Sequence, residues 1–119
     1  NALGANGCLN LITLWTHTSS ANNKTLRARY SGAAGTIYMS VVATTTASTK
    51  MSTQISNRNA TNSQVGFEPT TSFSTINAAN ITSAVDTTAS TTVVITGQKA
   101  SAGETLTLES YYLEIVYGK

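Results

Sequence analysis

The last third of the chain constrains the fold most strongly. Segments 86–98 (DTTASTTVVITGQ) and 104–118 (ETLTLESYYLEIVYG) are long and rich in threonine, β-branched and aromatic residues, and the turn-rich stretch 97–103 separates them. Residues of these types fit the pleated surface of a strand. The sequence therefore predicts two long strands joined by a short loop near the C-terminal end.

The second of these strands has an unusual alternation. One alternate set of side chains is mostly apolar, with Ser110 and Glu114 as its polar members, whereas the other changes from threonine to apolar at Tyr111. The apolar members of the first set are Leu106, Leu108, Tyr112 and Val116, and the second set is Thr105, Thr107, Tyr111, Leu113 and Ile115. Because alternate residues point to opposite faces of a strand, the second face becomes covered midway. The cover is either another subunit or a bulge that shifts the register.

The rest of the chain also favours strands. Expected strands lie at 7–18, 24–30, 36–45, 48–57 and 71–76, with 77–86 left open between a strand and one turn of helix. In the third of these, Ile37, Met39 and Val41 are expected to share a face. Six or more strands at spacings of about ten residues predict an all-β fold, an antiparallel β-sandwich with jelly-roll-like connectivity.

Composition limits the size and the setting of the protein. A chain of 119 residues forms one domain, 1–119, and because it begins at Asn1 without methionine we expect it to be the C-terminal piece of a longer chain. Only 10% of the residues are charged and the net charge is +2, so threonine, serine and asparagine supply the polarity. Such a surface suits packing against identical copies or binding neutral polar ligands. No apolar run is long enough for membrane insertion, and the single cysteine, Cys8, excludes a disulfide within the chain.

The inventory of reactive side chains argues against an enzyme. His17 is the only histidine, and no motif places it beside a nucleophile. A glycosidase needs two facing carboxylates, and only a pair involving the loop residues Glu68 and Asp86 stays open. The sequence has no cluster of cysteine and histidine that could bind a metal, and it has no phosphate-binding loop. Its three arginines are too few to indicate a nucleic-acid-binding surface. We therefore expect no catalytic residues, no cofactor, no metal and no nucleic-acid partner.

Segment 56–71 (SNRNATNSQVGFEPTT) has two interpretations. Asparagine tolerates left-handed backbone and bonds its own main chain, so the segment is first a connection between strands. Exposed loops on rigid sandwiches also commonly bind ligands. The alternative is therefore a receptor-reading loop with Asn59, Asn62 and Gln64 as ligand-binding residues. Trp15, the other candidate for a sugar contact, lies in the most apolar strand and is expected in the core.

Three stretches carry a family resemblance. In order they are SSANNKTLRARYSGAAGTIY, ISNRNATNSQVG and SAVDTTASTTVVITGQKASAGETLTLESYYLEIV. Together they resemble the small β-rich domains at the C-terminal ends of bacteriophage tail fibres, tailspikes and related virion proteins, over nearly the whole chain. None of the three is a catalytic signature, and the resemblance lies in their order.

The resemblance implies a location and a partner. It implies an extracellular domain on the virion, in the phage tail, that forms a homotrimer and either caps a fibre or contacts the host surface, where a cell-surface glycan is the expected ligand. The apolar set Tyr111, Leu113 and Ile115 is then the expected trimer interface, because closed assembly removes an open strand edge. Two alternatives remain: a carbohydrate-binding module that acts alone, and a capsid decoration protein.

Overall fold

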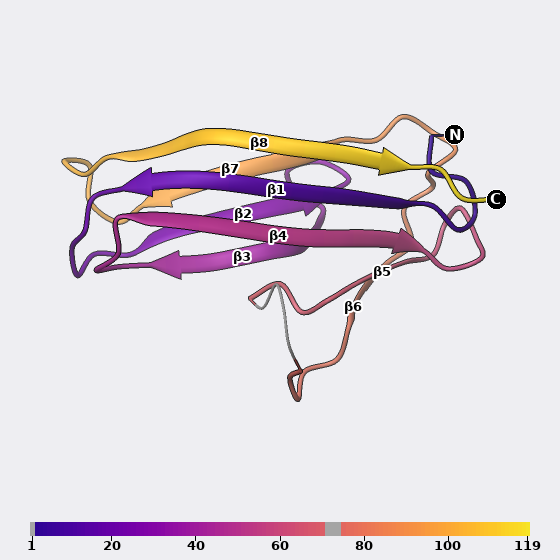
Figure 1. Ribbon diagram of the computed structural model, residues 1–119, viewed down its shortest axis with the longest axis horizontal. Coiled ribbons are helices and arrows are strands. Elements are labelled where there is room, and N and C mark those ends of the chain that lie inside the picture. The colour runs from indigo at the N-terminus through magenta and orange to yellow at the C-terminus, as the bar shows by residue number, and fades with distance from the viewer. Residues whose placement is uncertain (1, 71–74) are drawn as a thin grey trace.

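The computed structural model describes residues 2–70 and 75–119, and in that part of the chain it contains strands and no helix (Figure 1). The strands are β1 (Cys8–His17), β2 (Lys24–Tyr30), β3 (Thr36–Ala43), β4 (Ser48–Asn57), β5 (Gln64–Gly66), β6 (Ile81–Ser83), β7 (Val93–Lys99) and β8 (Leu106–Val116). The all-β prediction is confirmed. The described residues accordingly offer no helix of the length and apolarity that crossing a membrane requires.

The strands form two antiparallel sheets that pack face to face. One has the order β6-β5-β4-β1-β8 and the other the order β3-β2-β7. β3 lies against β4 and β7 against β8, so the smaller sheet covers the long strands of the larger one (Figure 1). This confirms the predicted β-sandwich. β1 pairs with β8 and β2 with β7, a nested pairing typical of a jelly roll, while the β2–β3 hairpin returns the chain so that β4 lies beside β1.

The core lies between the two sheets. It consists of Leu3, Leu9, Leu11, Trp15, Leu26, Ala28, Tyr30, Tyr38, Met39, Met51 and Ile55. In β2 and β4 the inward residues alternate with outward ones along the strand. Trp15 is buried, as expected, and its indole N–H donates to Thr13 Oγ1 at 3.0 Å.

A bulge in β8 explains its changing alternation. Leu14 is the partner of Ser110 and Trp15 is the partner of Leu108, so Glu109 is an extra residue. The extra residue reverses the alternation, and the apolar residues on both sides of it face the smaller sheet. These are Leu106 and Leu108 before the bulge and Tyr111, Leu113 and Ile115 after it. The bulge, one of the two explanations left open by the sequence, is therefore present in the chain.

A second bulge, in β3, corrects one prediction. Ala28 pairs with Met39 and Arg29 with Ile37, which leaves Tyr38 as the extra residue. Ile37 therefore does not share a face with Met39. Tyr38 instead enters the core, where its ring meets that of Tyr30 edge-on with centroids 6.5 Å apart.

The middle of the chain differs most from expectation. Segment 77–86 contains the strand β6, so the helical alternative is wrong, and β5 is a short strand inside a stretch expected to be a loop. Of the strand expected at 71–76, residues 71–74 lie outside the described part of the chain. The seventh strand begins at Val93, later than its Thr-rich approach suggested.

Backbone hydrogen bonds join the two ends of the described chain. Asn6 N–H donates to Gly118 O at 3.1 Å, and Gly118 N–H donates to Leu3 O at 2.9 Å. Both ends therefore lie at one end of the sandwich, and the loops that precede β2 and β8 lie at the other (Figure 1).

Candidate functional site

The second half of β8 is an exposed apolar edge. Among the described strands β8 pairs only with β1, so the other side of its backbone is open. Six large apolar or aromatic side chains along it and just after it are exposed: Tyr111, Tyr112, Leu113, Ile115, Val116 and Tyr117. Soluble proteins normally protect such an edge with lysine, proline or a bulge. The bulge at Glu109 precedes this half, and no lysine or proline lies within it.

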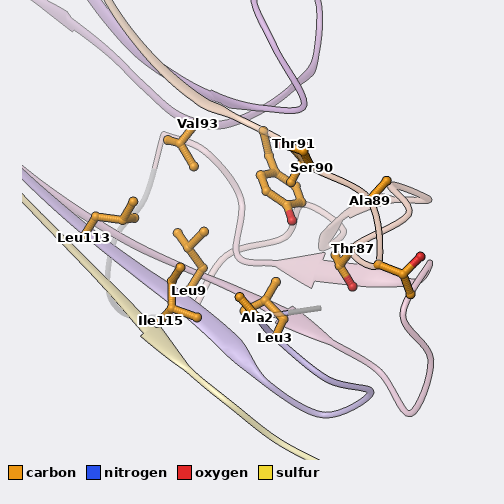
Figure 2. Close-up of a pocket in the computed structure, with 12 residues that line it drawn as sticks. Ala2, Leu3, Leu9, Thr87, Ala89, Ser90, Thr91, Val93, Leu113 and Ile115 are labelled. Carbon is orange, nitrogen blue, oxygen red and sulfur yellow. The ribbon is translucent and has the colours of Figure 1, made fainter.

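An apolar groove runs beside this edge, between β7 and β8. One hollow, of about 330 Å³, is lined by Leu3, Leu9, Val93, Leu113, Ile115 and segment 87–91. Figure 2 shows Leu9 and Ile115 pointing into it, with Val93 across from them. An adjoining hollow of about 380 Å³ shares Val93 and Leu113 and continues to Tyr111. The two sheets thus remain open to solvent along this side.

The predicted interface residues lie together in this groove. Tyr111 is 65% exposed, Leu113 40% and Ile115 50%, although all three face the same way as the buried Leu9 and Leu11. The groove is apolar and accessible. A partner that fills it remains a prediction.

Gln64, predicted to bind a ligand, is fully buried. Its Nε2 donates to Asn57 Oδ1 at 2.8 Å and to Val85 O at 3.0 Å, and its Oε1 accepts from Val85 N–H at 2.8 Å and from Ser83 Oγ at 3.1 Å. The prediction for Gln64 is therefore wrong, because both ends of its amide are used inside the fold. Gln64 joins β5 to β6 and to the segment after β6. No sequence motif marks this role, since its partners come together only through the fold.

The other two predicted ligand residues, Asn59 and Asn62, are exposed. Asn59 has left-handed backbone, with φ of 53°, and its N–H donates to Asn6 Oδ1 at 2.9 Å. The loop is closed by Arg58 N–H, which donates to Ser63 O at 2.9 Å. These contacts show the turn role expected of the segment. A ligand-binding role for Asn59 and Asn62 remains a prediction.

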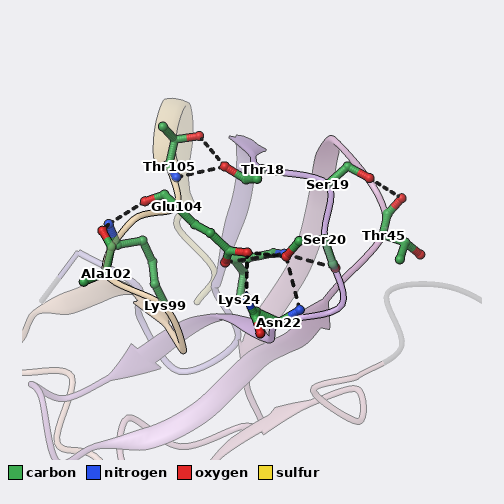
Figure 3. A network of polar contacts seen from close by, with 10 residues as sticks. All are labelled: Thr18, Ser19, Ser20, Asn22, Lys24, Thr45, Lys99, Ala102, Glu104 and Thr105. Carbon is green, nitrogen blue, oxygen red and sulfur yellow. Dashed lines mark hydrogen bonds and ion pairs between the residues drawn. The ribbon is translucent and has the colours of Figure 1, made fainter.

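A buried ion pair closes the opposite end of the sandwich (Figure 3). Lys24 Nζ lies 3.8 Å from Glu104 Oε2 and donates to Ser20 Oγ at 3.0 Å. Glu104 also accepts hydrogen bonds from Ser20 Oγ and from Asn22 Nδ2. These two hydrogen bonds, with a smaller contribution from the charges of Lys24 and Lys99, hold the pKa of Glu104 below its ordinary value. Lys24 shares the inward alternation of Leu26, which was the only sequence signal for its burial.

The candidate acid and base groups make local hydrogen bonds. His17 is buried and its Nε2 lies 3.0 Å from Thr49 Oγ1. Asp86 accepts hydrogen bonds from the hydroxyl and backbone N–H of Thr88, which lower its pKa. Glu68 accepts from Thr70 within its own turn in the same way. In residues 2–70 and 75–119, no three histidine, cysteine or acidic side chains gather where they could hold a metal ion.

Comparison with known proteins finds no significant match to this chain, whether among protein-family models, curated proteins or solved structures. What the chain does is therefore inferred from its residues and their geometry.

Proposed function

We propose that this chain is a non-enzymatic structural domain of a phage virion, located at the tip of a tail fibre or tailspike, where three copies associate and contact the host surface. The observation that supports this most is the exposed apolar edge of β8 with the groove beside it. The order of motifs that resembles tail-fibre domains supplies the phage setting.

The energetics of the edge favour association. Complete burial of a side chain such as leucine or isoleucine contributes about 1.5–3 kcal/mol, so covering several half-exposed ones contributes several kcal/mol. An open strand edge also invites uncontrolled pairing with other chains. A closed cyclic assembly covers the same edge of every copy and leaves none exposed. Leu113 and Ile115, which line the groove, would lie at the centre of this interface.

The test is the oligomeric state at micromolar concentration, measured by sedimentation velocity. Wild-type protein is expected to sediment as a trimer, and Leu113→Lys and Ile115→Lys as monomers. Val42→Lys is a matched control, because Val42 is also a large exposed aliphatic residue, 55% accessible, but belongs to the other sheet. It should remain trimeric. A monomeric wild-type protein would contradict the proposed assembly.

The virion location needs a separate measurement. Cryo-microscopy of phage particles that carry this chain is expected to place it at the distal end of a tail appendage. Density on the capsid shell instead would identify a decoration protein and contradict the proposed location.

A further inference from the structure

The outer face of the larger sheet carries a polar row beside an exposed tyrosine. Gln54, Asn10 and Glu114 are register partners across β4, β1 and β8, and the next outward row is Ser52, Ile12 and Tyr112. These six residues line a shallow cleft of about 380 Å³ on the face away from the core. The cleft is separate from the apolar groove, because adjacent residues of a strand point to opposite faces.

Two members of the polar row are held by a hydrogen bond, and the row still has hydrogen-bonding capacity. Asn10 Nδ2 donates to Glu114 Oε2 at 2.9 Å, which orients both side chains. This bond leaves the second carboxylate oxygen and the amide oxygen of Asn10 as acceptors. The exposed amide of Gln54 adds a donor and an acceptor on the neighbouring strand. Neighbouring strands lie about 4.8 Å apart, so three polar groups follow one another at a regular spacing.

Tyr112 supplies the apolar part of the cleft. It is 55% exposed and stands next to the partly buried Ile12 across the strand pair. Tyrosine combines a flat apolar ring with a polar tip. A sugar ring has a matching division: one face of C–H groups that packs on an aromatic ring, and a rim of hydroxyl groups that both donate and accept hydrogen bonds.

The charge of the cleft selects among ligands. Glu114 is its only charged lining residue within the described chain. A carboxylate repels phosphate and acidic sugars, and it accepts hydrogen bonds from neutral hydroxyl groups. Nucleic acid and acidic polysaccharides are therefore disfavoured.

We propose that this cleft binds a neutral saccharide, with the ring stacked on Tyr112 and the hydroxyl groups hydrogen-bonded to Asn10, Gln54 and Glu114. The inference rests on the host-attachment part of the proposed function and gives it a site and a ligand class. The site differs from the loop at 59–64 that the sequence suggested.

The experiment is a glycan array printed with neutral and acidic oligosaccharides, followed by titration calorimetry with the neutral glycan that binds best. Tyr112→Ala and Gln54→Ala are each expected to weaken binding at least about fivefold, because a stacked ring and a polar contact are lost. Tyr112→Phe keeps the ring and should retain most of the affinity. Melting temperatures within a few degrees of wild type show that each variant is folded.

Tyr111→Ala is the matched control. Tyr111 is the same residue type, adjacent in sequence and similarly exposed, but it lies on the opposite face. It should leave glycan binding unchanged and weaken assembly, whereas Tyr112→Ala should weaken glycan binding. Glycan binding by a monomeric chain would contradict the proposed trimer but would agree with the proposed binding cleft.

Three results overturn the inference. The first is wild-type protein that binds no neutral glycan at millimolar concentration, and the second is binding confined to acidic glycans. The third is equal loss of binding in Tyr111→Ala and Tyr112→Ala, which would make the binding a property of the assembled edge.

Discussion

Lys24 and Glu104 form an ion pair, 3.8 Å between Nζ and Oε2, that ties the start of β2 to the loop leading into β8. Lys24 is fully buried, and Ser20 and Asn22 supply the hydrogen bonds that keep the carboxylate ionised. One charged contact at the loop end of the sandwich thus joins a strand of the smaller sheet to the loop before β8 (Figure 3).

The first prediction concerns pH. The pKa of Glu104 is lower in the folded chain than its ordinary value. The folded state therefore binds the proton less readily than the unfolded state. The ionised Glu104 therefore stabilises the folded state. Its contribution is complete above the ordinary glutamate pKa and is lost as the pH falls through the lower pKa of the folded state. Urea denaturation between pH 7 and pH 3 should show a declining free energy of unfolding.

The Glu104→Gln variant should show a weaker decline over the same range. Asp86→Asn is the comparison, because the pKa of Asp86 is also lowered, by Thr88, and it lies outside the ion pair. Each variant should remove only its own part of the pH dependence. An unchanged pH profile in Glu104→Gln would show that the ion pair is not linked to folding.

The second prediction concerns the asymmetry of the ion pair. Glu104→Ala should destabilise the fold more than Lys24→Met. Removal of the carboxylate leaves a buried ammonium without its counter-charge, whereas removal of the lysine leaves a carboxylate still held by Ser20 and Asn22. Midpoints of chemical denaturation at pH 7 measure the difference. The reverse order would mean that the hydrogen bonds do not compensate the carboxylate.

The third prediction compares two of the three predicted ligand residues of the loop, Gln64 and Asn62. Gln64→Ala should lower the free energy of unfolding by about 1–3 kcal/mol or more, because it leaves the buried Asn57 Oδ1 and the part-buried Val85 N–H unsatisfied. Asn62→Ala, at an exposed position, should change it by less than about 0.5 kcal/mol. Thermal and urea unfolding measure both. Equal effects would contradict the structural role assigned to Gln64.

The fourth prediction concerns a close approach in the core. A Cβ atom at Gly66 would lie 2.5 Å from the ring of Tyr38, which is itself buried. Gly66→Ala should therefore destabilise the fold by about 1–3 kcal/mol through overpacking. Gly103→Ala is the control, because a Cβ there meets nothing within 4 Å. If the two variants unfold at the same denaturant concentration, the packing of Tyr38 against β5 is not as described.

The sequence predicted the fold wherever alternation was regular. In 24–30 every second side chain is buried, and in 48–57 every second side chain is buried or partly buried, because a strand in a sandwich has one face on the core. It failed in 36–45, where the extra residue Tyr38 reverses the alternation and carries no motif. In 104–118 the changed alternation did indicate a bulge as one of two explanations, and the pairing with β1 identifies Glu109 as the extra residue.

Candidate sites were predicted less well, for a physical reason. The sequence singles out Tyr111, Leu113 and Ile115, because the side chains on their face change from threonine to apolar residues at Tyr111. These three side chains are exposed because β8 is an edge strand. Gln64 was misread because its environment is made by residues far along the chain. The outer cleft was not predicted either, because it needs three strands in register.

The bonded chain ends have a mechanical consequence. Cys8 and Val116, at the terminal ends of β1 and β8, are register partners in an antiparallel pair. Tension applied between them would load the backbone hydrogen bonds between β1 and β8 one pair at a time, as in unzipping. Tension between Val116 and the opposite end of the sandwich, where the loop before β8 lies, would load many of those hydrogen bonds at the same time, in shear. The domain should therefore withstand force transmitted along its strands and peel under force that separates its two ends.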